Sequence, residues 1–263
     1  MRIKMPMSKN EVEDLKYAKE LLENPGLAAR ISDALGTAID KGFEMLPAKW
    51  SQVVQQATKE SLRKALEFAV ITMNEQPRLS SWNFLHKMLA ATSGAVGGAF
   101  GLPALTVELP VSTIIMLRSI ADIARSEGEK IETLEAKLAC LEVFALGGKS
   151  PGDDATETGY FVVRAAFARE VSEAVKYIAK KGVAEGSAPA ISRFITKIAS
   201  RFGVTVSEKI AAQAVPLIGA VGGALINTIF IDHFQDMARG HFVVRRLERI
   251  YGTDEVKRQY EKL

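Results

Sequence analysis

The polar run DHFQD contains the side chains of this sequence whose types and spacing best fit metal binding or proton transfer. If the run is helical, Asp232 and Asp236 lie one turn apart, and His233 lies three residues before Asp236 on the same side. Carboxylate oxygens and imidazole nitrogens are ligands of hard and borderline cations. One interpretation is therefore a metal-dependent enzyme that uses these three residues, with Glu108 or Asp122 as further ligands.

A structural interpretation explains the same residues, and we favour it. A buried carboxylate needs a partner, and the planar guanidinium of arginine fits a carboxylate well. Ion pairs with Arg118, Arg125 or Arg239 would satisfy the acidic groups without a metal or a reaction. We therefore predict no catalytic residue, no metal and no cofactor. The candidate polar cluster consists of Glu108, Arg118, Asp122, Asp232, His233, Asp236 and Arg239.

The sequence does not support other motifs that carry chemistry. The run Gly148-Lys149-Ser150 resembles the end of a phosphate-binding loop, but Val143 stands where that loop needs its first glycine. The single cysteine, Cys140, excludes an intramolecular disulfide and lies in an apolar stretch that is typical of a core. With 34 basic and 31 acidic residues, the net charge of +3 does not indicate nucleic-acid binding.

Helical periodicity extends along nearly the whole chain, with apolar residues recurring three and four positions apart. Ser8 and Glu11 have the spacing of a capping box, and Pro25-Gly26 ends the helix that they begin. Pro110 is expected to kink or restart its helix. The sequence therefore predicts an all-α multi-helix bundle. In its second half, helices are expected at about 158–181, 188–202, 205–215 and 216–251, after a polar loop at 149–158.

Two glycine-rich apolar segments share the hexapeptide GAVGGA, which occurs at residues 94–99 and 219–224 and indicates an internal duplication. A glycine inside a helix costs about 1 kcal/mol relative to alanine, so these segments need an offsetting contact. Glycines four positions apart lie on one helix face and allow a second helix to approach closely, as in a glycine zipper. The glycines assigned to helix packing or membrane contact are Gly94, Gly97, Gly98, Gly101, Gly219, Gly222 and Gly223.

The stretches 88–107 and 210–231 contain no charged residue and approach the length of about 20 residues that a helix needs to cross a bilayer. Their many small and polar residues weaken insertion, and basic residues flank both stretches on both sides. Three interpretations of these stretches stay open: a buried core, membrane insertion and reversible association with a membrane surface. The segment Arg239–Arg249 has the pattern of a basic amphipathic helix, which either contacts anionic headgroups or is solvated.

Residues 93–128, 139–148 and 198–252, with the helix that starts near Gly159 between them, resemble the EcsC protein family. Together they cover most of residues 82–252, and the first 80 residues add little to the likeness. The family takes its name from the third gene of a bacterial operon that also encodes an ABC transporter. The resemblance therefore implies a membrane-transport setting by association, and it supplies no catalytic residue or cofactor.

The predicted organisation has an N-terminal helical region at 1–80, an EcsC-like helical core at 81–252 and a charged C-terminal tail at 253–263. No apolar run follows the basic first ten residues, so we expect no secretory signal and a cytoplasmic location. The leading hypothesis is a non-enzymatic bacterial accessory protein near the cytoplasmic face of the membrane, with a membrane lipid or membrane protein as its partner. The alternatives are the metal-dependent enzyme and a soluble helical scaffold.

Overall fold

The computed structural model describes residues 6–23, 26–36, 39–72, 101–148, 159–183, 188–215 and 219–263, without the side chains of residues 72, 101–104 and 219–221. Every regular element in these ranges is an α-helix, which confirms the predicted fold class. The helices are α1 (Lys9–Glu23), α2 (Leu27–Leu35), α3 (Asp40–Glu44), α4 (Trp50–Thr72), α6 (Gly101–Ser126), α7 (Leu134–Leu146), α8 (Tyr160–Lys181), α9 (Pro189–Ala214), α10 (Gly219–Tyr251) and α11 (Thr253–Lys262).

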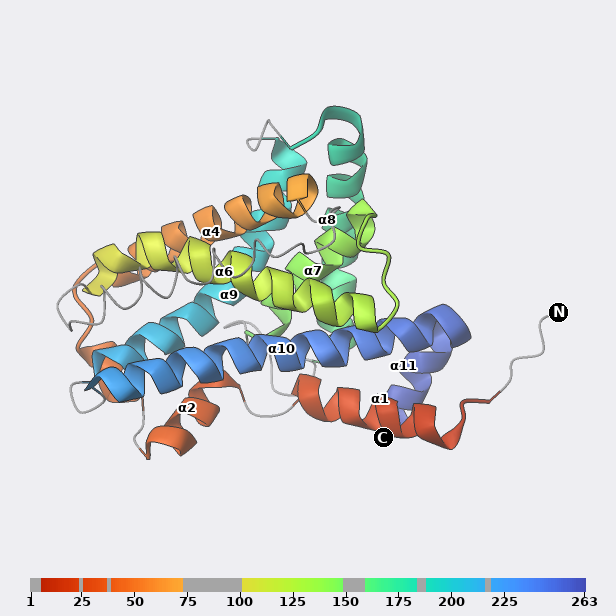
Figure 1. Cartoon of the computed structure of the whole chain (residues 1–263), viewed down its shortest axis with the longest axis horizontal. Coiled ribbons are helices and arrows are strands. Elements are labelled where there is room, and N and C mark those ends of the chain that lie inside the picture. Colours follow the sequence, from red (N-terminus) through yellow and green to blue (C-terminus); the bar gives the residue numbers. More distant parts are fainter. Residues whose placement is uncertain are drawn as a thin grey trace.

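Helix α10, with 33 residues, is the axis of the bundle and contacts α1, α2, α6, α7, α9 and α11. Figure 1 shows it crossing the whole molecule, with α4 and α6 packed side by side over it and α1 beneath it. Helices α8 and α9 form a hairpin that rises across the direction of α10. None of the helices in the described part of the chain is long and apolar enough to cross a membrane.

The core is centred on α7, whose residues Ala136–Ala145 are all buried. A helix that is covered on every side needs apolar residues around its whole circumference, and these ten residues supply them except at Lys137 and Glu142. Phe144 of α7 packs against Phe202 of α9 and Phe234 of α10, with ring centroids 4.9 and 5.3 Å apart. These aromatic contacts join the three helices that surround the centre of the molecule.

Helix starts and ends follow the sequence signals in part. Before α1, the backbone N–H of Ser8 donates to Glu11 at 2.8 Å and the Glu11 N–H donates to the Ser8 hydroxyl at 3.3 Å, which is the predicted capping box. The break predicted between residues 202 and 205 is wrong, because α9 is continuous through Gly203, with Phe202 and Val206 fully buried on either side. Burial of both flanking side chains outweighs the low helix propensity of one glycine.

Helix α6 also continues through Pro110, so the proline does not restart the helix. Pro110 is buried between Leu109 and Thr113, and packing of this turn holds the helical backbone although the proline has no N–H to donate. The charged segment after residue 252 forms α11, which buries Val256 and Tyr260 next to α1 and α10.

Glycines permit close backbone approach at places other than the second GAVGGA copy. A Cβ on Gly148 would overlap the carbonyl oxygen of Arg201, and a Cβ on Gly240 would lie 2.9 Å from the carbonyl oxygen of Ala18. By contrast, no described atom lies within 4 Å of the position that a Cβ on Gly223 would take. The first GAVGGA copy lies outside the described residues, so contact between the two copies stays a prediction.

Replacing Gly148 or Gly240 with alanine is expected to lower the free energy of unfolding by about 1–3 kcal/mol, because the backbones must separate. Gly223→Ala is the matched control and should raise it by up to about 1 kcal/mol, since alanine is the better helix former and meets open space. Urea denaturation of the three variants measures both effects. Equal losses of unfolding free energy in all three variants would show that Gly223 also lies against another backbone.

Candidate functional site

The predicted polar cluster does not assemble into one site. Asp232 is exposed, whereas Asp236 accepts hydrogen bonds from Arg239 at 2.9 Å and from Arg30 of α2 at 2.8 Å. The Arg30 partner was not anticipated, because it lies 206 residues away in the sequence. The described residues contain no group of three His, Cys, Asp or Glu side chains placed to hold a metal ion.

His233 is buried and contacts the end of α7. Its Nε2 lies 2.9 Å from the carbonyl oxygen of Gly147, so the neutral ring donates from Nε2 and leaves Nδ1 unprotonated. Burial lowers the pKa of His233 to about 4, although the Gly147 hydrogen bond acts in the opposite direction. The imidazole therefore satisfies a carbonyl at the C-terminus of α7 and carries no charge near neutral pH.

The remaining members of the cluster lie apart from one another. Glu108 accepts from the buried Lys209 ammonium at 2.8 Å, and Asp122 pairs with Arg125 one turn along α6. The Arg118 guanidinium lies over the ring of Phe68, 5.8 Å from its centroid. The structure thus brings Asp236 and Arg239 together and distributes the other five residues over separate contacts.

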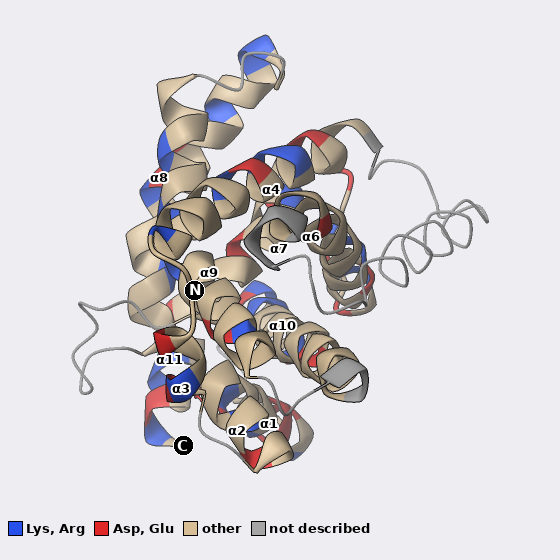
Figure 2. Ribbon diagram, turned by 90° about the vertical axis from the view of Figure 1, so that its left-hand side faces the viewer, with Lys and Arg blue, Asp and Glu red and all other residues tan. Residues whose placement is uncertain are grey.

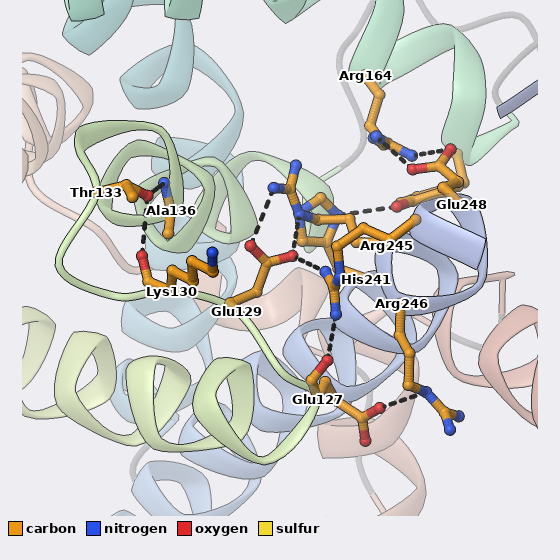
Figure 3. A network of polar contacts seen from close by, with 12 residues as sticks. Glu127, Glu129, Lys130, Thr133, Ala136, Arg164, His241, Arg245, Arg246 and Glu248 are labelled. Carbon is orange, nitrogen blue, oxygen red and sulfur yellow. Dashed lines mark hydrogen bonds and ion pairs between the residues drawn. The ribbon is translucent and has the colours of Figure 1, made fainter. Parts of the chain in front are cut away.

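A second set of polar residues, not anticipated as a group, meets beside the C-terminal half of α10 (Figure 3). We call this set the internal polar network. Its members come from α7, α8, α10 and the connection between α6 and α7. They are Glu127, Glu129, Glu142, Tyr160, Arg164, His241, Arg245, Glu248 and Arg249.

Glu129 is the centre of one half of the network, between two arginines of α10 (Figure 3). Arg245 donates to both of its carboxylate oxygens, at 2.8 and 3.2 Å, and Arg249 donates to one of them. Burial raises the pKa of Glu129, but the hydrogen bond and charge of Arg245, followed by Arg249, outweigh it and hold the pKa below its usual value. Glu129 therefore stays ionised and joins the α6–α7 connection to α10.

The other half of the network joins α8 to α10. Arg164 donates to both oxygens of Glu248, at 2.8 and 3.0 Å, and the Tyr160 hydroxyl lies 2.9 Å from Nδ1 of His241. Glu142 of α7 is buried close to these charges. Burial raises its pKa to about 7, and the nearby Arg164 and Arg245 limit that rise.

The arginines of the segment Arg239–Arg249 are therefore engaged with carboxylates of the protein. Arg246 pairs with Asp14 of α1 at 2.7 Å and with Glu127 at 2.9 Å, and the others pair as described above. The sequence contained a partial signal for the internal polar network, since the spacing of His241, Arg245 and Glu248 places all three on one face of a helix. The segment is predominantly a packing surface and not the free basic face that its sequence suggested.

At least two recesses open on the surface of the described part. The larger, of about 530 Å³, lies between α4 and α9 and is lined mainly by polar side chains that include Gln52, Gln55 and Gln56. The smaller, of about 290 Å³, lies where α1, α8 and α11 meet and is floored by Tyr160, Phe161 and Tyr260. Through Tyr160 the smaller recess borders the internal polar network, whose ionised members are bonded mainly to one another.

These features define the class of the protein: it is an all-α bundle with a buried central helix and an internal polar network. The chain belongs to the EcsC protein family, whose family model matches residues 9–247. That match includes α1 to α4, the region that contributed little to the likeness found in the sequence. Neither the curated proteins nor the solved structures contain a match to this chain.

Proposed function

We propose that this member of the EcsC family is an accessory protein that acts by binding, at or near the cytoplasmic face of a membrane. The family association with an ABC transporter operon makes membrane transport the proposed setting. An enzymatic role gains no support from the internal polar network, because its hydrogen bonds join α8 and the α6–α7 connection to α10 and serve packing. The observation that carries the membrane proposal is the surface at one end of the bundle.

That surface, which we call the charge-free end, consists of the uncharged first turns of α6 (residues 101–107) and of α10 (residues 219–231), and both helices begin at the same end of the molecule (Figures 1 and 2). Residues 210–231 contain no charged side chain, and the one acidic group at the start of α6, Glu108, is paired with Lys209. Val107 is 68% exposed and Leu225 is 40% exposed there. Exposed aliphatic side chains on uncharged helical turns partition into the interfacial region of a bilayer. The charged side chains Asp40, Lys41 and Glu44 of α3, which packs against α9, are exposed outside these turns.

Sedimentation with phospholipid vesicles tests the proposal. The wild-type protein should bind, and the double variant Val107→Asp/Leu225→Asp should lose about tenfold or more in affinity, because two aliphatic side chains no longer leave water. The matched control is Val162→Asp/Ile250→Asp, which changes two aliphatic side chains that are 58% and 60% exposed at other places. It should bind as the wild type does.

Two outcomes contradict the proposal. One is complete recovery of the wild-type protein in the soluble fraction of cells together with no sedimentation on vesicles. The other is equal loss of binding in both double variants, which would show that the charge-free end has no special part. Either result would favour the soluble helical scaffold, which should be monodisperse without detergent.

A further inference from the structure

Positive charge concentrates on the hairpin formed by α8 and the first half of α9. Residues 160–200 contain seven Lys and Arg against three acidic residues, a net charge of +4, whereas the whole chain has only +3. Figure 2 shows basic residues up to the tip of α8, while acidic and basic residues alternate along α4. We call residues Tyr160–Lys181 and 189–200 the basic hairpin.

The acidic side chains of the basic hairpin are already engaged within it. Glu170 pairs with Lys197 at 2.9 Å, and Glu173 accepts from both Arg169 and Arg193, at 2.8 and 2.6 Å. Arg169 and Arg193 are still 84% and 57% exposed, so most of their donors face solvent.

Three lysines continue this surface toward the tip, namely Lys176, Lys180 and Lys181. All three are exposed, and no carboxylate of the described residues pairs with them. The helix dipole favours lysine in the last turn of α8, which accounts for Lys180 and Lys181 but not for Lys176 or the two arginines. The surface therefore has an excess of positive charge that the fold itself does not need.

Shape and composition favour a protein over a bilayer as the partner. The basic hairpin projects across the direction of α10, so a bilayer at the charge-free end would not reach its tip (Figure 1). Its other exposed side chains are mostly small, such as Ala165, Ala168 and Ser172, and offer little apolar area for insertion apart from Val162 at the base of α8. Bilayer binding by a surface helix needs such area in addition to charge.

We propose that the basic hairpin binds an acidic segment of a partner protein, with Arg169, Lys176, Lys180, Lys181 and Arg193 as the contact residues. Arginine and lysine clusters recognise acidic motifs through charge-assisted hydrogen bonds. The Glu173 bridge holds the two guanidiniums in place before the partner arrives, which lowers the conformational cost of binding. This proposal extends the accessory role above and uses a surface separate from the charge-free end.

Fluorescence anisotropy with a labelled polyglutamate peptide is the test, at low and near-physiological salt. The triple variant Lys176→Glu/Lys180→Glu/Lys181→Glu should lower the affinity by about tenfold or more, because each change replaces an attraction with a repulsion. The control Lys9→Glu/Lys16→Glu/Lys130→Glu alters net charge equally at exposed positions elsewhere and should change the affinity by about twofold at most. Circular dichroism checks that both variants keep their helices.

Three results would overturn the proposal: no peptide binding near physiological salt, equal losses in the two triple variants, or displacement of the peptide by anionic vesicles. The last would make a bilayer the occupant of the basic hairpin. The vesicle measurements on the Val107 and Leu225 variant are independent of these results, so failure of the basic-hairpin proposal and failure of the membrane proposal are distinguishable.

Discussion

Replacing Glu129 with alanine is expected to lower the free energy of unfolding by about 3–5 kcal/mol, the largest single effect that we anticipate. The side chain of Glu129 is only 7% exposed and accepts hydrogen bonds from Arg245 and Arg249. Without its carboxylate, the Arg245 guanidinium, 26% exposed, loses its bidentate partner at a partly buried position. Removing one member of a buried pair costs more than the pair contributes, because the other charge is left without compensation.

Glu173 supplies the matched control, since it too accepts from two arginines but lies on the surface. Its partners Arg169 and Arg193 are 84% and 57% exposed, so water can replace the lost carboxylate. Glu173→Ala should therefore cost about 1 kcal/mol or less. Urea denaturation at one pH measures both variants, and similar losses would mean that the internal polar network contributes no more than a surface pair.

Local features of the fold could be predicted from the sequence. The capping box at Ser8 and the long helix α10 depend on residues within a few turns of one another, and both are present. The break predicted at Gly203 and the helix restart predicted at Pro110 are both absent, for the same reason. Their local preferences are real, but packing of the buried neighbours Phe202 and Leu109 outweighs them.

The candidate site could not be predicted from the sequence because its partners are distant in the chain. Helical spacing showed which residues share a face with Asp236, but it could not show that Arg30 covers that face. Likewise Glu129 meets Arg245 across 116 positions, and nothing local marks the two as a pair. Glu142, an acidic residue in the middle of the apolar run that forms the second half of α7, was the sequence signal most able to reveal the internal polar network.

The pH dependence of stability should change when Glu142 becomes glutamine. Burial raises the pKa of Glu142 from 4.5 to about 7, so the folded state binds a proton more tightly than the unfolded state. The resulting stabilisation is fully present below pH 4.5 and is lost as the pH rises through 7. Arg164 and Arg245 favour the ionised form of Glu142 and Glu248 opposes it, so all three residues contribute to the pKa of Glu142.

Glu142→Gln removes this titration, because an amide is neutral at every pH. The stability of the variant relative to wild type should therefore rise by roughly 3 kcal/mol between pH 4.5 and 8, as the wild type has to ionise a buried carboxyl. His233 acts with the opposite sign: its pKa of about 4 contributes stability that is present above 6.5 and lost as the pH falls toward 4. Both proteins contain this histidine, so the difference between their urea-unfolding free energies isolates Glu142. Parallel curves across this pH range would show that Glu142 titrates normally in the folded protein.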